Sequence, residues 1–245
     1  MTALCTWLLV VGLCDLLRAT RDTITSRHRW VLVALGISLL LFAAAWLELP
    51  PRGWVTLGLT WSVGLVGWLV CSSAALDSGS VRRPRWRALA FAALLGPSLL
   101  LALFGGAVPM APSLPGLVDD SILGRIGSEA GLLLAGVVLF QLSTANIAVR
   151  LLLDAVGVPA LSNEKQLKGG RVLGPMERLF IIGLGLAGSL GAAAVVVAAK
   201  GLLRYPELQR KQAEGPTDIS EYFLIGSFAS WLLALAGLGV LALGR

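Results

Sequence analysis

The sequence predicts an all-α fold, a polytopic transmembrane helix bundle of six or seven spans. Of 245 residues, 56% are hydrophobic and only 14% are charged, whereas a soluble domain carries roughly 25% charged residues. The mean hydropathy is +0.82, because long apolar runs alternate with short charged segments. The clearest run, Leu179 to Ala199, has no charged residue and matches the about 20 residues that a helix needs to cross a bilayer. We therefore expect a single membrane domain.

Seven segments are predicted to span the membrane, most of them bounded by charged residues or prolines. They are residues 3–19, 30–47, 53–76, 88–104, 130–153, 176–203 and 222–243. The first is the weakest, because its 14 uncharged residues would extend only about 21 Å as a helix. It needs Asp15 to Ala19 to cross, and six helices remain if it does not.

Three longer segments separate the predicted spans. Residues 105–129 form a Pro/Gly-rich outer loop, residues 155–175 a cytoplasmic loop and residues 204–221 an outer charged connector. Within the outer loop, Asp119 and Asp120 together with Glu129 supply oxygen ligands of the kind that divalent cations prefer. No regular ligand pattern accompanies them, so helix capping is the preferred interpretation.

The distribution of Lys and Arg predicts an N-terminus outside and a C-terminus in the cytoplasm. With seven spans, 14 of the 20 basic residues fall on the inner side and six on the outer side, as the positive-inside rule requires. This topology places Lys168 and Lys211 on opposite sides of the membrane. The connector before the last span fits least well, because it carries Arg204, Arg210 and Lys211 outside.

Several function classes are excluded by composition and motif context. The net charge of +6 resides in short loops, where topology and anionic headgroups explain it, so no nucleic-acid partner is expected. Cys5, Cys14 and Cys71 are scattered among apolar residues and are interpreted as packing residues. His28 is the only histidine, too few for a zinc site or a histidine-based triad. No catalytic residue, metal or cofactor is predicted.

The fifth span carries a polar stripe that is the best intramembrane candidate site. Polar residues in hydrocarbon must face protein, water or a ligand. Hydrogen bonding between helices is the simpler explanation, and the wall of a polar cavity open to the inside is the alternative. The stripe consists of Gln141, Ser143, Thr144, Asn146, Arg150 and Asp154.

Charged residues flank the sixth span and offer a second candidate site. In a continuous helix Glu177 and Lys200 are about 35 Å apart, so we do not expect them to pair. Glu177 and Arg178 at one end and the two basic residues at the other are interpreted mainly as anchors that suit the helix dipole and snorkel to the interface. The alternative is a small outer charged site formed by Lys200, Arg204 and Glu221.

Small residues recur every four positions on the last two spans. Gly183, Ala187 and Gly191 share one face, and Gly226 and Ser230 share another. Such faces let helices approach closely, so the two spans are predicted to pack there. The glycines of residues 183–188 also fit the dinucleotide pattern G-x-G-x-x-G. That pattern requires a preceding strand and a water-facing helix start, which a lipid-crossing helix does not provide.

The C-terminal third resembles an uncharacterised family of bacterial multi-pass membrane proteins, a domain of unknown function. The resemblance rests on three pieces in order, at residues 170–178, 198–204 and 221–227. The N-terminal part departs from it, because it lacks a first helix bearing His and Asp. The resemblance implies a bacterial cytoplasmic membrane protein and supplies no activity.

Function is left as three expectations. The first is a small carrier or lipid-handling protein that uses the stripe and the charges flanking the last two spans. The second is a non-catalytic subunit or scaffold, for which the small-residue faces suffice. A membrane enzyme acting on a lipid-linked substrate comes third. The expected partners are the lipid bilayer and either a membrane protein or a second copy of the chain.

Overall fold

The computed structural model of the chain describes residues 1–18, 25–77, 84–104, 129–158, 170–213 and 219–244, and this part is helical without strands. The all-α fold class is thereby confirmed. The chain divides into two compact units. Unit 1 comprises residues 1–144 and 241–245, and unit 2 comprises residues 145–240.

The helices of unit 1 follow the first four predicted spans and the first part of the fifth. They are α1 (Thr2–Arg18), α2 (Ser26–Trp46), α3 (Pro51–Asp77), α4 (Pro84–Phe104), α6 (Glu129–Leu139) and the π-helical turn η2 (Phe140–Thr144). Two of these helices begin at proline, whose fixed φ and missing N–H suit the first helical position.

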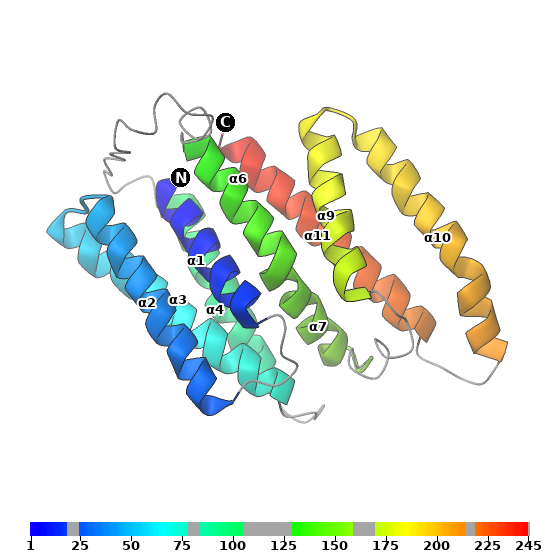
Figure 1. Cartoon of the computed structure of the whole chain (residues 1–245), viewed down its shortest axis with the longest axis horizontal. Helices are drawn as coiled ribbons and strands as arrows, with labels where there is room; N and C mark the ends of the chain where they lie inside the picture. The colour runs from blue at the N-terminus through cyan, green and yellow to red at the C-terminus, as the bar shows by residue number, and fades with distance from the viewer. Residues whose placement is uncertain (19–24, 78–83, 105–128, 159–169, 214–218, 245) are drawn as a thin grey trace. The chain divides into compact units, whose positions relative to one another are not determined.

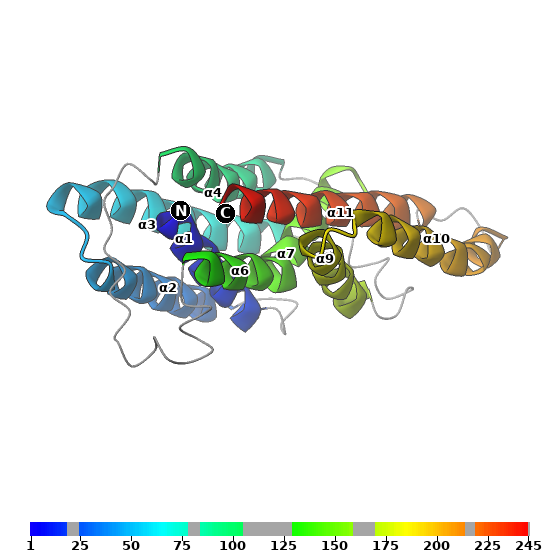
Figure 2. The same cartoon turned by 90° about the horizontal axis from the view of Figure 1, so that it is seen from above.

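Helix α1 is the core of unit 1, although its sequence marks it as the weakest span. It contacts α2, α3, α4, α6 and η2 (Figures 1 and 2). Ala3, Trp7, Val11 and Cys14 are 0% exposed. The helix continues through Asp15 to Arg18, as crossing the membrane would require.

Close backbone approach explains how α1 fits against α6 and η2. A Cβ on Gly12 would lie 2.9 Å from the backbone carbonyl carbon of Leu139, so only glycine permits this packing. The Ser143 hydroxyl also donates a hydrogen bond of 2.7 Å to the Gly12 carbonyl. The short, apolar α1 is therefore held by main-chain proximity and by burial of its large side chains.

Apolar side chains also cover the outside of unit 1. Phe42 on α2 is 65% exposed, Val63 on α3 is 68% exposed and Leu99 on α4 is 61% exposed. Water would make such a surface costly, whereas lipid tails would solvate it.

Five helices in the described part are long and apolar enough to cross a membrane, consistent with a membrane protein. They are Ser26–Trp46, Pro51–Leu76, Pro84–Phe104, Glu129–Ala155, which joins α6, η2 and α7, and Ser220–Leu243.

The helices of unit 2 correct the predicted sixth span. They are α7 (Ala145–Ala155), α9 (Gly170–Leu186), α10 (Leu190–Ala213) and α11 (Ile219–Leu243). Residues 176–203 are therefore not one helix but a helical hairpin, α9–α10 (Figure 1). Of the glycines that fit the dinucleotide pattern, Gly183 and Gly185 lie near the end of α9 and Gly188 lies in the turn, so they do not open a helix after a strand.

A Schellman motif ends α9 and explains the break. Gly188 has φ +75°, a backbone conformation that glycine adopts without a Cβ penalty. Its N–H donates to the Gly185 carbonyl, and the Ser189 N–H donates to the Leu184 carbonyl at 2.8 Å. The chain then reverses, and α10 starts at Leu190.

Three contacts within unit 2 set the helix directions. On α11, Ser230 binds Arg178 of α9, and Leu238 lies against Gly185 further along α9, so α9 and α11 are parallel. Helix α10 runs opposite to both, because it returns along the hairpin (Figure 1). Asn146 of α7 and Ser230 of α11 both bond to Arg178, whereas Leu153, later on α7, lies against Gly226, earlier on α11, so α7 and α11 are antiparallel.

Two predicted loops are also shorter than expected. The connector at residues 204–221 is largely helical, because α10 continues to Ala213 and α11 begins at Ile219. The segment at residues 155–175 ends earlier, since α9 begins at Gly170. The outer loop falls outside the described residues except for Glu129.

Candidate functional site

A buried arginine links three helices of unit 2. Arg178 of α9 is only 1% exposed. Its Nη1 donates to Ser230 Oγ of α11 at 2.8 Å, and its Nη2 donates to Asn146 Oδ1 of α7 at 2.6 Å. Gly174, one turn earlier on α9, leaves room beside this group, since a Cβ there would lie 3.4 Å from Arg178 Nη1. The guanidinium plane is thus fixed from two directions.

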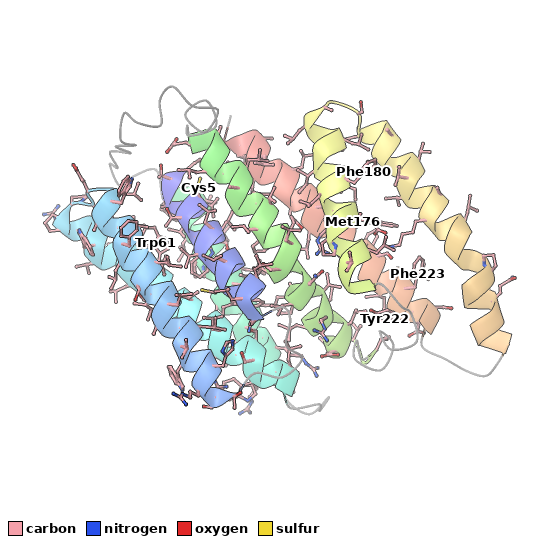
Figure 3. All side chains as sticks on the ribbon, in the orientation of Figure 1. Cys5, Trp61, Met176, Phe180, Tyr222 and Phe223 are labelled. Atoms are coloured by element: carbon pink, nitrogen blue, oxygen red, sulfur yellow. The ribbon has the colours of Figure 1, made fainter. Side chains whose placement is uncertain are left out.

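An ion pair crosses the helical hairpin beside this arginine. Lys200 Nζ of α10 lies 2.7 Å from Glu177 Oε2 of α9, with side chains 19% and 13% exposed, respectively. Lys200 Nζ also lies 3.5 Å from Ser227 Oγ and 5.3 Å from the centre of the Phe223 ring, both on α11. Figure 3 labels Phe223 among the side chains of this region. A cation over an aromatic face is attracted by the ring quadrupole.

These two sets of contacts form one cluster, because their members are neighbours in sequence. Glu177 and Arg178 are adjacent on α9, and Ser227 and Ser230 are three residues apart on α11, hence on one face. We call this set the unit 2 polar cluster. It consists of Asn146, Glu177, Arg178, Lys200, Phe223, Ser227 and Ser230.

The cluster is rich in positive charge and in hydrogen-bond donors. Two cations and one carboxylate leave a formal charge of +1 at neutral pH. Each serine oxygen accepts a bond from a cation, which leaves its O–H as a donor. Such an arrangement favours an anion with several acceptor oxygens over a cation or a neutral apolar ligand.

A second buried charge cluster lies in unit 1. Asp15 and Arg18 of α1 form an ion pair of 2.7 Å with side chains 0% and 2% exposed. From α3, Trp68 Nε1 donates to Asp15 Oδ2 at 2.9 Å, and Ser73 Oγ accepts from Arg18 Nη1 at 3.2 Å. The Arg18 guanidinium also lies 5.6 Å from the centre of the Trp68 ring. Four side chains therefore compensate one another inside the helix bundle.

The predicted polar stripe is divided by the structure. Gln141, Ser143 and Thr144 belong to η2 and to unit 1, where all three are buried. Asn146, Arg150 and Asp154 belong to α7 and to unit 2. The regular 3-4-4 spacing assumed an unbroken α-helix, whereas a π-helical turn adds a residue and shifts the faces that follow it. Only Asn146 joins the unit 2 polar cluster through a contact described above.

The proposed outer charged site is not assembled as predicted. Lys200 pairs with Glu177, which the continuous-helix interpretation placed out of reach. Glu221 is exposed in the first turn of α11, and the described contacts do not join it to Lys200. Arg204 lies in α10, and its side chain is outside the described set.

The predicted small-residue packing face is also wrong on the hairpin. A Cβ added to Gly183 or to Gly191 would meet no described atom within 4 Å, and Ala187 lies in the exposed turn. Helices α9 and α11 instead approach at Gly185, where the Leu238 side chain leaves no room for a Cβ. On α11, Gly226 faces Leu153 and Ser230 binds Arg178.

The sequence does not identify several members of these clusters, and for three of them the reason is clear. Glu177 was placed out of reach of Lys200 by the assumed helix length, although both residues are nearly equidistant from Gly188. Asp15 and Arg18 served only to lengthen a short span. Their three-residue spacing on a helix was the signal of a pair.

Among the residues that the structure describes, the cysteines and the remaining acidic groups form no further site. Cys5, Cys14 and Cys71 are free and buried, which agrees with the packing interpretation. Glu129 accepts a hydrogen bond from the Thr2 hydroxyl, whereas Asp119 and Asp120 lie outside the described residues. No cluster of three or more His, Cys, Asp or Glu residues suited to a metal occurs in the part that the structure describes.

Comparison with models of known protein families, with curated proteins and with solved structures gives no match. The candidate site therefore rests on the geometry described above.

Proposed function

We propose that this chain is a small carrier or lipid-handling protein of the bacterial cytoplasmic membrane. The observation that carries the proposal is the unit 2 polar cluster. The sequence treats the polar stripe and the charges flanking the sixth predicted span as two sites. In the cluster, Asn146 of the stripe is linked to those charges through Arg178, Lys200 and the serines of α11.

The composition of the cluster favours handling of a ligand over structure alone. Charged side chains at membrane depth are costly, and they commonly mark pathways for substrates and ions. Apolar side chains alone would suffice to pack α9 against α10, so packing does not require the ion pair. Neither Glu177 nor Lys200 is fully buried. An incompletely buried ion pair beside a buried arginine is accessible to a polar group that enters from the surface.

The hairpin also changes the proposed topology. Because α9 and α10 are antiparallel, the chain leaves the hairpin on the side where it entered, and α11 crosses in the outward direction. With the N-terminus outside, the inner segments then take Arg204, Arg210 and Lys211, and only Arg52, Arg125 and Arg245 of the 20 basic residues remain outside. This distribution follows the positive-inside rule more closely than seven spans do.

Reconstitution tests the carrier or lipid-handling function directly. The purified chain would be placed in liposomes with fluorescent anionic phospholipid in one leaflet, and movement between leaflets would be followed by quenching of accessible fluorophore. The expected result is movement faster than in protein-free liposomes and slower with Arg178→Gln. Uptake of labelled phosphate and of organic phosphates would be measured in parallel. Rates equal to those of empty liposomes for every probe would contradict the proposal.

A scaffold function is the second candidate, and one observation favours it. Gly183 and Gly191 are exposed on the hairpin with no described neighbour within 4 Å of a Cβ, beside exposed apolar side chains such as Val195 at 68%. Small residues of this kind allow another transmembrane helix to approach closely. Co-purification of a stoichiometric partner in mild detergent, lost with Gly191→Leu, would support a scaffold over a carrier.

A further inference from the structure

We propose that the unit 2 polar cluster binds a phosphate group, and that Glu177 acts as an internal counter-ion which the phosphate displaces from Lys200. The inference rests on the proposed function and names its ligand class. Two sources share this chemistry, the headgroup of an anionic lipid and a soluble phosphate compound.

The hydroxyl groups of α11 give the first argument. Hydroxyls within helices commonly bond to the carbonyl four residues earlier, and Ser73, Ser98 and Thr60 of unit 1 do so at 2.6 to 2.7 Å. Ser227 and Ser230 have no such bond among the described contacts. Both are buried, at 8% and 5% exposed, and both accept from a cation. Their O–H groups are therefore free to donate to a further acceptor within the cluster.

The two cations give the second argument. Arg178 is held by Asn146 and Ser230 at short distances, so its orientation is set before a ligand arrives, which reduces the entropic cost of binding. The Lys200 ammonium has three donors. Glu177 and Ser227 occupy two of them. A phosphate oxygen entering beside Ser227 would thus meet a hydroxyl and an ammonium together.

Glu177 supplies the third argument. Without a ligand, its carboxylate neutralises Lys200 across the hairpin at 2.7 Å. A phosphate carries more charge and more acceptor oxygens than a carboxylate, so it competes for Lys200. The released carboxylate would remain at the surface of unit 2, because the Glu177 side chain is already 13% exposed. The exchange consists of hydrogen bonds and ion pairs only, and no covalent bond changes.

This mechanism predicts opposite effects for the two members of one ion pair. Lys200→Gln removes a phosphate ligand and is expected to weaken binding about tenfold or more, as loss of a charge-assisted hydrogen bond does. Glu177→Gln removes the competitor and is expected to strengthen binding about three- to tenfold. A purely structural ion pair predicts that neither variant binds more tightly than the native chain.

The experiment measures equilibrium binding to the full chain purified in a neutral detergent. The probes are dihexanoylphosphatidic acid and inorganic phosphate, with dihexanoylphosphatidylcholine as a zwitterionic reference. Tight binding of phosphatidic acid alone would identify a lipid headgroup, and binding of inorganic phosphate with equal affinity would identify a soluble source. Either supports the inference when the Lys200 and Glu177 variants shift affinity in opposite directions. Failure of both probes to bind, or shifts in the same direction, would overturn it.

Two further variants distinguish the loss of a phosphate ligand from a loss of folding. Lys200→Arg keeps the charge and is expected to retain affinity within about threefold, and Ser227→Ala is expected to lose about threefold to tenfold. Ser189→Ala, in the exposed turn of the hairpin, is the matched control and should not change affinity. Binding without movement in liposomes would support this inference and contradict the carrier function. Lipid movement in liposomes that the Lys200 and Glu177 variants do not change would support the carrier function and contradict this inference.

Discussion

Lys200 Nζ lies 2.7 Å from Glu177 Oε2, although the two residues are 23 positions apart in the chain. A continuous helix would separate them by about 35 Å. The pair exists because Gly188 ends α9 and lets α10 return along it. The same turn brings Lys200 to Ser227 of α11 and reverses the direction of α10 relative to α9.

Thiol cross-linking tests the hairpin. In a chain whose three native cysteines are replaced by alanine, Glu177→Cys with Lys200→Cys should be joined by a short bis-maleimide. Glu177→Cys with Leu190→Cys should react less, because Leu190 begins α10 at the turn. A continuous helix predicts a cross-link in neither pair, since residue 190 is then about 20 Å from residue 177 and residue 200 about 35 Å. Mobility on denaturing gels after cleavage between the helices distinguishes the two outcomes.

Reporter fusions test the topology. Fusions after Lys168 and after Lys211 are expected to report the same side of the membrane, and a fusion after Arg245 the opposite side. Alkaline phosphatase and green fluorescent protein give complementary signals for the two sides. Opposite sides for Lys168 and Lys211 would restore the seven-span arrangement and contradict antiparallel α9 and α10.

The buried ion pair of unit 1 should be far more sensitive to loss of one partner than to loss of both. Asp15→Ala leaves the Arg18 guanidinium uncompensated, and removal of one partner from a buried pair costs about 3–5 kcal/mol. Asp15→Leu combined with Arg18→Met leaves no charge behind and should recover most of that loss. Thermal unfolding in detergent is the measurement, and the expected Tm order is native, double variant, Asp15→Ala. A double variant less stable than the single one would contradict the pairing.

Close packing of α1 predicts a large effect for one methyl group. Gly12→Ala would place a Cβ 2.9 Å from the Leu139 backbone, and such overpacking typically costs about 1–3 kcal/mol. Gly58→Ala on α3 is the matched control, because no described atom lies within 4 Å of its Cβ. It should be neutral or stabilising by about 0.5–1 kcal/mol, as alanine is preferred over glycine within helices. Equal Tm values for the two variants would show that α1 does not pack against α6 as described.

Hydrophobic patterning predicted the fold class and most of the helices, because a helix needs a long apolar run to cross a bilayer. It could not predict the hairpin. Residues 179–199 carry no charge, and this pattern is the same for one long helix or for two short ones. Gly188 was the local signal, but glycines are common in transmembrane helices and also serve packing. The same local sequence is compatible with either structure, so it does not reveal that Gly188 ends α9.

The polar residues were found more easily than their partners. Asn146, Lys200 and Ser230 all stood out in apolar surroundings, yet each was assigned to a different feature. Their convergence follows from helix directions within unit 2, and those directions follow from the hairpin. The π-helical turn at Phe140–Thr144 has no sequence signal that we can identify, and it divides the predicted stripe.

The short helices of the hairpin have a consequence for biosynthesis. The apolar part of α10, Leu190–Leu202, has 13 residues, or about 20 Å, too little to cross a bilayer alone, and α9 carries Glu177 without Lys200 until α10 has been made. Neither half is therefore stable in lipid until the other has been made. Truncated chains that end between Gly188 and Ala213 would, once released from the ribosome, leave α9 at the membrane surface, accessible to proteases, and only longer chains would withdraw it. Insertion of this segment thus waits for translation to pass the second half.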